Sequence, residues 1–504
     1  MRKKMGIAAF TAALAALVAL ALPALASAQS LAEVAGAVEE KAAELDMVWV
    51  AVATVLVFLM QAGFMFLEVG FSRQKNAGTG VAKIFVNLAI CTLAWWAIGY
   101  GIAEGGGNDF FGTSGFFFHF DQTIGQGEEA FNVAGPDAML MLYGLAFCAV
   151  SLAIVWGTTL ERIKFGAYVV YAIVFGAVIY PLVAHAVWGG GLLSDIGGKP
   201  VMDFAGSSVV HLTGAVGALA ALLLLGPRRG KYDADGNPRV IPGHSMPLVG
   251  LGVIILWIGW FGFNGGSTFE TAGSFFGEVM LNTQLAAAAG VIGASLAVYL
   301  KSRTLDVGMA GNGAIAGLVG ITAPSGFVEY WAAPIIGFVA GLIVVFAVLA
   351  VDRLLDDPVG ALSAHGLAGI WGTLSVGIFG SARLVSEGAA PGVWYSVFGD
   401  VPFSSSLGQL GVQGLAVLFT FVVVFSISIV TFKLIKSTIG LRVSEEEEDA
   451  GLDISSHGMY GYPEQFIPQP EYSTGLPRTF GEVGAGIAAP APAQMTAAED
   501  AVGG

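Results

Sequence analysis

The sequence is 504 residues long, with 55% hydrophobic and only 12% charged residues. Apolar runs of roughly 20 residues, the length that crosses the hydrocarbon core of a bilayer, recur along most of the chain. We therefore predict a polytopic membrane protein. The formal net charge of -15 argues against a nucleic-acid partner. The two cysteines, Cys91 and Cys148, fall inside apolar runs, which excludes a disulfide framework and a Cys-rich metal site.

Residues 1–28 are typical of a secretory signal peptide. Arg2 begins a short basic stretch, an apolar core follows, and Ala26, Ser27 and Ala28 form a small-residue cleavage site. The alternative is an uncleaved first helix. The rest of the topology is the same in either case.

Apolar runs and the residues that interrupt them predict eleven spans. The predicted fold class is an all-α polytopic membrane protein with eleven transmembrane helices. We expect an inverted repeat of five plus five helices and a long C-terminal helix. The spans cover approximately 46–72, 80–103, 136–160, 164–187, 203–226, 246–265, 273–300, 308–324, 330–351, 360–381 and 408–435.

Basic residues gather in alternate loops, and short cytoplasmic loops carry the excess of Lys and Arg. We therefore predict a multi-pass protein with its N-terminus outside and its C-terminus in the cytoplasm. The opposite loops hold only Lys199 and Arg383. The residues assigned to the cytoplasmic side are Arg73, Lys75 and Lys83, then Arg162 and Lys164, then Arg228, Arg229, Lys231 and Arg239, and finally Lys301, Arg303, Arg353, Lys433, Lys436 and Arg442.

Two histidines in the apolar spans share one sequence frame, Asp-x-x-Gly-x-x-x-x-His. Asp203 precedes His211 in the fifth span, and Asp357 precedes His365 in the tenth. The two spans run in opposite directions, and eight helical residues cover about 12 Å. We therefore expect the two imidazoles to reach the membrane midplane from opposite faces and to meet there, which would fit an inverted repeat.

An ionisable side chain inside a membrane is by default a hypothesis about a substrate or proton path. One alternative is that each histidine is a core residue bonded to a neighbouring backbone carbonyl. Another is that the pair binds a metal or a haem, but the other histidines fall in loops, in the tail or near a helix end. We expect neutral imidazoles that act as donors and acceptors along a narrow path.

Aromatic residues converge at the predicted outer ends of other spans. Trp188 closes the fourth span, Phe263 and Ser267 end the sixth, and Tyr143 and Phe147 lie one turn apart on the third. An interfacial belt or plain packing is the alternative explanation. Aromatic faces with one hydroxyl acceptor would suit a cation, since a desolvated cation–π contact contributes about 2 kcal/mol or more.

These motifs resemble those of the ammonium transporter (Amt/Mep/Rh) family, and of its bacterial Amt type in particular. The resemblance runs in order from about residue 46 to 462. Tyr143 stands where many bacterial members have phenylalanine, and the loop between Trp188 and Asp203 is slightly longer than in enteric members. The motifs are Trp188-Gly-Gly-Gly191, Asp203-Phe-Ala-Gly206 with His211, Gly259-Trp-Phe-Gly-Phe-Asn-Gly-Gly-Ser267, Gly313-Ala-Ile-Ala-Gly-Leu-Val-Gly320 and Gly440-Leu-Arg-Val-Ser-Glu-Glu.

The resemblance implies a transporter rather than an enzyme, without a cofactor or metal, in the inner membrane of a bacterium. It implies a homotrimer with one pore per subunit that conducts ammonium or ammonia, with methylammonium as a further substrate. The implied site residues are Phe147, Trp188 and Ser267 for substrate binding, Phe147 and Phe263 for the gate, His211 and His365 for the pore, and Asp203 for structural and electrostatic support without touching the substrate.

The predicted domains after the signal peptide are a membrane domain over residues 29–439 and a cytoplasmic tail over 440–504. The tail contains an acidic run at residues 445–449, and we expect disorder beyond about residue 463. The family resemblance implies that a P-II type regulatory protein binds at the cytoplasmic face. The alternative for the acidic run is a solvated linker.

Two functions remain open from the sequence. The first is transport, in which ammonium is recruited at the aromatic mouth, deprotonated, and passed as ammonia through the histidine pore. The second is an ammonium sensor or receptor that transports little, although relatives of that kind usually carry a fused signalling domain.

Overall fold

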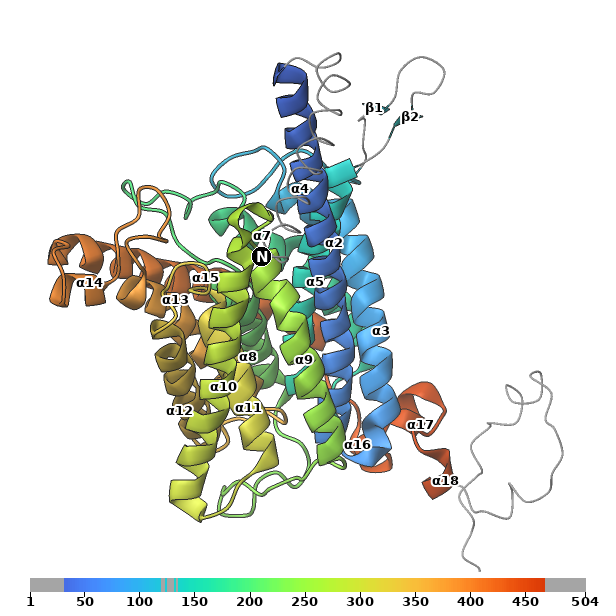
Figure 1. The fold of residues 1–504 in the computed structure, drawn as a ribbon. Helices are drawn as coiled ribbons and strands as arrows, with labels where there is room; N and C mark the ends of the chain where they lie inside the picture. The colour runs from blue at the N-terminus through green and yellow to red at the C-terminus, as the bar shows by residue number, and fades with distance from the viewer. Residues whose placement is uncertain (1–30, 119–122, 125–130, 133–134, 467–504) are drawn as a thin grey trace, which may run out of the picture.

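The computed structural model describes residues 31–118, 123–124, 131–132 and 135–466, whose regular secondary structure is helical apart from two short strands (Figure 1). The predicted signal peptide and the tail from residue 467 onward lie outside the described residues. The first elements are α2 (Leu31–Phe71), η1 (Gln74–Asn76), α3 (Ala77–Ala94), η2 (Trp95–Gly99), α4 (Tyr100–Ala103), the two short strands β1 (Thr123–Ile124) and β2 (Phe131–Asn132), α5 (Gly135–Thr158), α6 (Phe165–Val174), η4 (Phe175–Ile179), α7 (Tyr180–Val187), η5 (Ser207–Leu212) and α8 (Thr213–Leu225).

Most of the helices pack side by side along one common direction, whereas the long helix α15 (Phe403–Thr438) crosses behind them at an angle (Figure 1). We call the end of the bundle that carries α16 (Glu445–Ala450) and α17 (Leu452–His457) the tail end, and the opposite end, near α4 and α7, the vestibule end (Figure 1). The remaining elements are α9 (Met246–Gly266), η6 (Ala272–Ser274), α10 (Phe275–Ser302), α11 (Val307–Thr322), α12 (Ala332–Val351), η7 (Leu362–Leu367), α13 (Ala368–Phe379), α14 (Val393–Val397), α15 (Phe403–Thr438), α16 (Glu445–Ala450), α17 (Leu452–His457) and α18 (Pro463–Phe466).

Ten helical segments in the described part of the chain are long and apolar enough to cross a membrane, and α11 is a shorter apolar helix. Each of the eleven predicted spans corresponds to one of these ten segments or to α11. The all-α polytopic fold class is therefore confirmed. Several spans combine α-helix with a wider π turn, as in α6, η4 and α7. The first helix begins at Leu31, well before the predicted residue 46, because its polar first turns continue the helix beyond the apolar run.

Glycine allows the helix backbones to approach closely, as expected for helices that pack in lipid. A Cβ at Gly252 of α9 would lie 2.5 Å from the backbone nitrogen of Leu67 in α2. A Cβ at Gly293 of α10 would lie 2.5 Å from the carbonyl oxygen of Phe338 in α12. Larger residues at these positions would force the helices apart.

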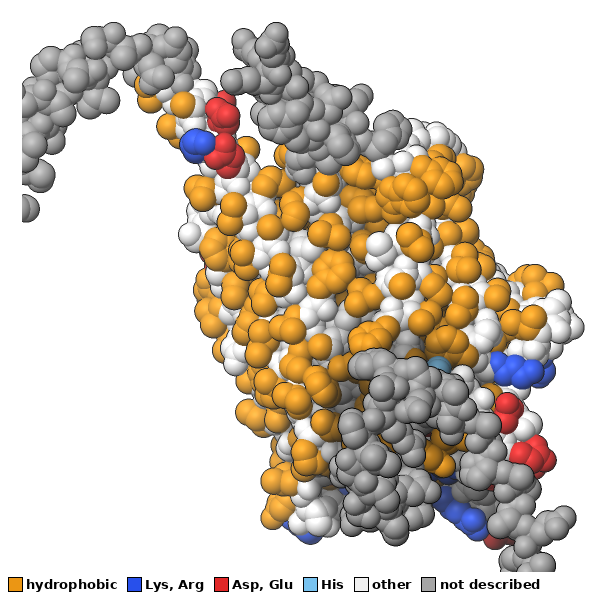
Figure 2. Space-filling view, turned by 90° about the vertical axis from the view of Figure 1, so that its right-hand side faces the viewer, with side chains coloured by type: hydrophobic (Ala, Val, Ile, Leu, Met, Phe, Trp, Pro, Cys, Tyr) orange, Lys and Arg blue, Asp and Glu red, His pale blue; other side chains and the backbone are white. Residues whose placement is uncertain are grey.

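Large apolar side chains cover the sides of the bundle. In Figure 2 they form a broad band across the middle of the molecule, with charged side chains near the lower margin and at the upper tip. The exposed residues include Val55 of α2, Phe85 of α3, Ile292 of α10 and Phe346 of α12. A wide apolar band around a helical bundle is the surface that a bilayer covers, so the chain is a multi-pass membrane protein.

Basic loop residues that the sequence places on one side of the membrane meet buried carboxylates at the tail end. Arg73 pairs with Glu161 at 2.5 Å, and Arg228 pairs with Asp356 at 2.9 Å. Arg162 is fully buried and donates to the backbone carbonyl of Asp356. These arginines bind the loops to one another.

The assignment of Lys83 to a cytoplasmic loop is wrong. The second membrane helix begins at Ala77 rather than near residue 80, and Lys83 lies within α3 with none of its side chain exposed. Its position on the buried face of α3 directs it into the bundle instead of toward water.

Candidate functional site

The first of the two Asp-x-x-Gly-x-x-x-x-His frames forms a capped helix start. The Asp203 carboxylate accepts hydrogen bonds from the four backbone N–H groups of residues 206–209 at 2.8–3.1 Å, and from the Ser208 hydroxyl at 2.6 Å. Gly206 has φ 111°, in the region that favours glycine. The chain then enters the π turn η5, which carries His211.

The second frame repeats this structure at the tail end of the bundle. The Asp357 carboxylate accepts hydrogen bonds from the backbone N–H groups of Gly360 at 3.1 Å and Leu362 at 2.8 Å. Gly360 has φ 77°, and the π turn η7 that follows carries His365. The sequence frame thus corresponds to one local structure used twice. Isolated π turns of this kind occur frequently at functional sites.

The two histidines meet inside the bundle. Their Nδ1 atoms are 3.2 Å apart, the ring centroids are 5.2 Å apart, and the ring planes differ by 22°. His211 is 0% exposed and His365 is 6% exposed. At this distance one Nδ1 donates to the other, so one hydrogen is shared between the rings.

This geometry bears on both alternatives for the histidines. Neither ring bonds to a backbone carbonyl in the described residues, and Nε2 of His211 has no hydrogen-bond partner there. Axial ligands of a haem would hold their nitrogens about 4 Å apart on opposite sides of the iron, from the usual metal–imidazole distance. The 3.2 Å contact between the nitrogens leaves no space for a porphyrin between the rings.

A cavity of about 610 Å³ lies at the vestibule end of the bundle. The three residues predicted to bind the cation, Phe147, Trp188 and Ser267, all line it, together with Tyr143 and Glu104. The rings of Phe147 and Trp188 lie 6.2 Å apart at 75°. The structure therefore brings the predicted aromatic site and its hydroxyl to one place.

Phe147 and Phe263, the predicted gate, stack with ring centroids 4.0 Å apart and an angle of 14° between planes. Phe147 lines the cavity, whereas Phe263 is fully buried and lies 5.5 Å from the His211 ring. The two rings thus separate the cavity from the histidines. The side chains form one continuous series from the cavity through both phenylalanines to His211 and His365.

The Ser267 hydroxyl is part of a small hydrogen-bond group at the cavity wall. It donates to the carbonyl oxygen of Phe263 at 2.8 Å and lies 3.1 Å from the Tyr143 hydroxyl. The Tyr143 hydroxyl also lies 3.2 Å and 3.0 Å from the carbonyls of Gly262 and Phe263. Tyr143 departs from the pattern that the sequence resembles. Its hydroxyl therefore competes with a bound cation for the hydrogen bond that the Ser267 oxygen can accept.

Asp203 does not line the cavity, and its carboxylate is occupied by its own helix start. Its backbone carbonyl accepts a hydrogen bond from the Trp188 indole at 2.8 Å. The residue is 4% exposed. The aspartate thus lies behind the cavity wall and holds both Trp188 and the start of the His211 helix.

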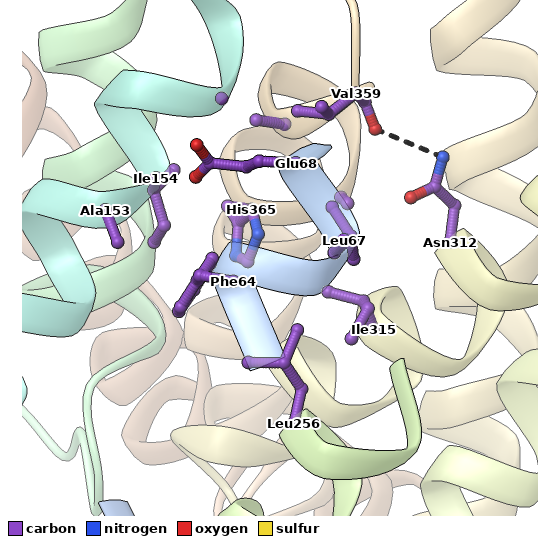
Figure 3. Close-up of a pocket in the computed structure, with 13 residues that line it drawn as sticks. Phe64, Leu67, Glu68, Ala153, Ile154, Leu256, Asn312, Ile315, Val359 and His365 are labelled. Atoms are coloured by element: carbon purple, nitrogen blue, oxygen red, sulfur yellow. Dashed lines mark hydrogen bonds between the residues drawn. The ribbon is translucent and has the colours of Figure 1, made fainter. Parts of the chain in front are cut away.

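Two neighbours of the histidines were missed by the sequence reasoning. Trp260 stacks on His211 with centroids 5.1 Å apart at 19°. Glu68 lines a small cavity on the far side of His365 (Figure 3). The signal for Glu68 was available, since it is an ionisable residue inside an apolar run and such residues mark functional paths.

The tail segment after α15 docks at the tail end. Ser444 and Glu447 form a capping box at the start of α16, and Glu448 is buried and pairs with Arg442 at 2.6 Å. The Asp453 carboxylate accepts from the backbone N–H groups at the start of α3, at 2.9 Å for Gly78. A purely solvated linker is therefore the wrong interpretation of the acidic run.

Comparisons with known proteins agree on one family. The family model described as Ammonium Transporter Family matches residues 48–462. Ammonium transporter Amt2 of Archaeoglobus fulgidus is 42% identical over 83% of this chain and 88% of its own length. The ammonium transporter of Bacillus subtilis is 32% identical over 83% of this chain and 98% of its own length.

Solved structures give the same result. A protein described as Sensor Amt Protein superposes with a TM-score of 0.74 at 32% identity, covering 83% of this chain and all of that chain. Mep2 of Candida albicans superposes with a TM-score of 0.69 at 29% identity, over 80% of this chain and 87% of its own. The matched region includes both histidine frames and the aromatic cavity, and the chain belongs to the ammonium transporter family.

Proposed function

We propose that this protein conducts ammonium or ammonia across the inner membrane of a bacterium. The observation that carries the proposal is the contact between His211 and His365 inside the bundle. The stacked pair Phe147 and Phe263 lies between this contact and the aromatic cavity. A bundle built only for packing would have no need of two imidazoles in its centre.

The first step is recruitment of the cation at the cavity. The faces of Phe147 and Trp188 attract a cation through their quadrupoles, and Ser267 offers a hydroxyl oxygen as an acceptor. Ammonium has four donors and suits such a site. Methylammonium keeps three of these donors and is a second substrate.

The second step separates the proton from ammonia. Beyond the phenylalanine pair the side chains are buried and mostly apolar, so carrying a full charge past them costs much more free energy than carrying neutral ammonia. The histidine pair offers nitrogens for the proton. A proton bound at one ring allows the shared hydrogen at Nδ1 to pass to the other ring, and the charge moves without the cation.

This separation predicts selectivity against potassium. Potassium has no proton to release, so it would have to pass the apolar segment as an ion. We therefore propose that transport is electrogenic, with ammonia and its proton crossing by adjacent routes.

The assembly and its regulation are also part of the proposal. We propose a homotrimer with one pore in each subunit, the N-terminus outside and the tail in the cytoplasm. The membrane domain covers residues 29–439 and the tail 440–504. A P-II type protein at the tail end would act on a surface to which α16 is already anchored through Glu448. Co-purification under a sudden rise in external ammonium, lost on truncation at Gly440, tests this part.

The second candidate function is ammonium sensing, and the similarity to the Sensor Amt Protein favours it. Growth of a transporter-deficient host on limiting ammonium separates the two functions. We expect growth with the wild-type chain and none with a variant that carries His211→Ala and His365→Ala at equal expression. No growth with a well-expressed wild-type chain would favour sensing.

A further inference from the structure

A second, much smaller cavity lies beyond His365, on the side away from the phenylalanine pair. Its volume of about 20 Å³ exceeds the roughly 10–15 Å³ needed to hold one water-sized molecule. The lining is apolar except for Glu68, His365 and Asn312. The Asn312 amide donates to the carbonyl oxygen of Val359 at 3.3 Å (Figure 3). Glu68 and His365 are the titratable groups among the lining residues.

The carboxylate of Glu68 is buried without hydrogen bonds. Its residue is 1% exposed, and neither carboxylate oxygen has a hydrogen-bond partner in the described residues. A buried carboxylate without a partner is costly, and buried charges are normally paired or hydrogen-bonded. In Figure 3 it lies beside His365 among apolar side chains, so the cavity provides the place for its missing partner.

An ordinary structural ion pair does not explain this residue. Lys83 of α3 is the charged group that interacts with Glu68 electrostatically, and its ammonium nitrogen is likewise without a hydrogen-bond partner among the described residues. The two do not form an ion pair within 4.0 Å, whereas Arg228 and Asp356 nearby lie at 2.9 Å. Lys83 therefore does not occupy the Glu68 oxygens, which are free for a small molecule.

We propose that Glu68 is the inner proton station of the pore, an inference that rests on the proposed transport of ammonia and a proton by separate routes. A proton on His365 passes to the Glu68 carboxylate, directly or through one water in the cavity, which leaves a neutral imidazole and a carboxylic acid. Ammonia that leaves the histidine pair takes this proton. The products are ammonium and the original carboxylate, so protons and charge balance.

The test compares variants in proteoliposomes, using ammonium-evoked currents on a solid-supported membrane and ammonia flux from the total ammonium that accumulates inside. We expect Glu68→Gln to lower the current roughly tenfold or more, in line with the loss of a positioned proton-transfer group, while ammonia flux stays within about twofold of wild type. Glu68→Asp keeps a titratable carboxylate, so it should restore part of the current and shift its pH profile.

A double variant separates proton transfer from charge balance. Glu68→Gln combined with Lys83→Met removes both charges, so recovery of the current in this variant would assign Glu68 a charge-balancing role and overturn the inference. A wild-type current in Glu68→Gln would also overturn it. Failure of the proposed transport mechanism looks different, because the wild-type protein itself would then give no ammonium-evoked current.

Discussion

Asp203 and Asp357 begin the same frame, yet their surroundings differ. The Asp203 carboxylate accepts hydrogen bonds from four backbone N–H groups and from the Ser208 hydroxyl. It lies behind the wall of the aromatic cavity. Asp357 is partly exposed, has backbone donors alone, and follows Asp356 in a cluster of buried charges. The repeated frame fixes the depth and direction of each histidine, and the surroundings determine the chemistry at each end.

The largest expected effect is on stability at the first frame. Asp203→Ala leaves several buried donors without a partner, and each costs roughly 1–3 kcal/mol, so we expect a loss of about 3 kcal/mol or more in the free energy of unfolding. Asp357→Ala removes a less buried cap, for which the usual cost is about 1 kcal/mol. Thermal unfolding of the purified variants in detergent gives both values, and equal losses would remove the distinction between the frames.

A pH effect of intermediate size is expected at Asp356, the residue that precedes the second frame. Burial alone would raise the pKa of Asp356, but hydrogen bonds from Arg228 and the charges of Arg162 and Arg228 outweigh it and lower that pKa from 3.8 to about 2. Because the pKa of Asp356 is lower in the folded than in the unfolded protein, its carboxylate stabilises the fold fully above about pH 4. This stabilisation is lost as the pH falls through about 2.

The difference between the two pKa values corresponds to about 2 kcal/mol. Unfolding measured between pH 6 and pH 3 should show the first part of this loss in the wild-type protein. The isosteric Asp356→Asn variant should lose less stability over the same range. An identical pH dependence in both proteins would show that this carboxylate is not the group that titrates.

The smallest expected effect is at the cavity beside the first frame. Tyr143→Phe removes the hydroxyl that lies 3.1 Å from Ser267, so the serine oxygen becomes free to accept from ammonium. One neutral hydrogen bond contributes about 0.5–1.5 kcal/mol, so we expect the KM for ammonium to fall by roughly two- to tenfold. Ser267→Ala is the matched control and should raise KM. A higher KM in Tyr143→Phe would mean that the tyrosine itself binds the cation.

Most of the fold could be predicted because apolar runs report directly on membrane spans. The eleven spans lie within a few residues of the observed helices, except at the start of α2, whose polar turns carry no apolar signal. The π turns η5 and η7 could not be predicted, because helical periodicity does not distinguish one widened turn. The anchored position of Glu448 was missed as well, since it depends on Arg442 and on basic residues distant in sequence.

The candidate site could be predicted where a side chain is unusual for its location. His211 and His365 are polar residues in apolar spans, and their shared frame predicted the contact that the structure contains. Trp260 was missed because a tryptophan in an apolar helix is usually a packing residue. Glu68 was missed and Lys83 was assigned to a loop for another reason, since both lie near a predicted end of a span, where charges are expected in water.

The central claim is that the histidine pair carries ammonia and its proton separately. The most direct test is ammonium-evoked current on a solid-supported membrane, recorded over ranges of ammonium concentration and pH, for the wild-type protein and for His211→Asp, with potassium as the competing cation. We predict a current with ammonium but not potassium in the wild type, and a potassium current in His211→Asp. Normal ammonia flux without any ammonium-evoked current in the wild-type protein would contradict the claim.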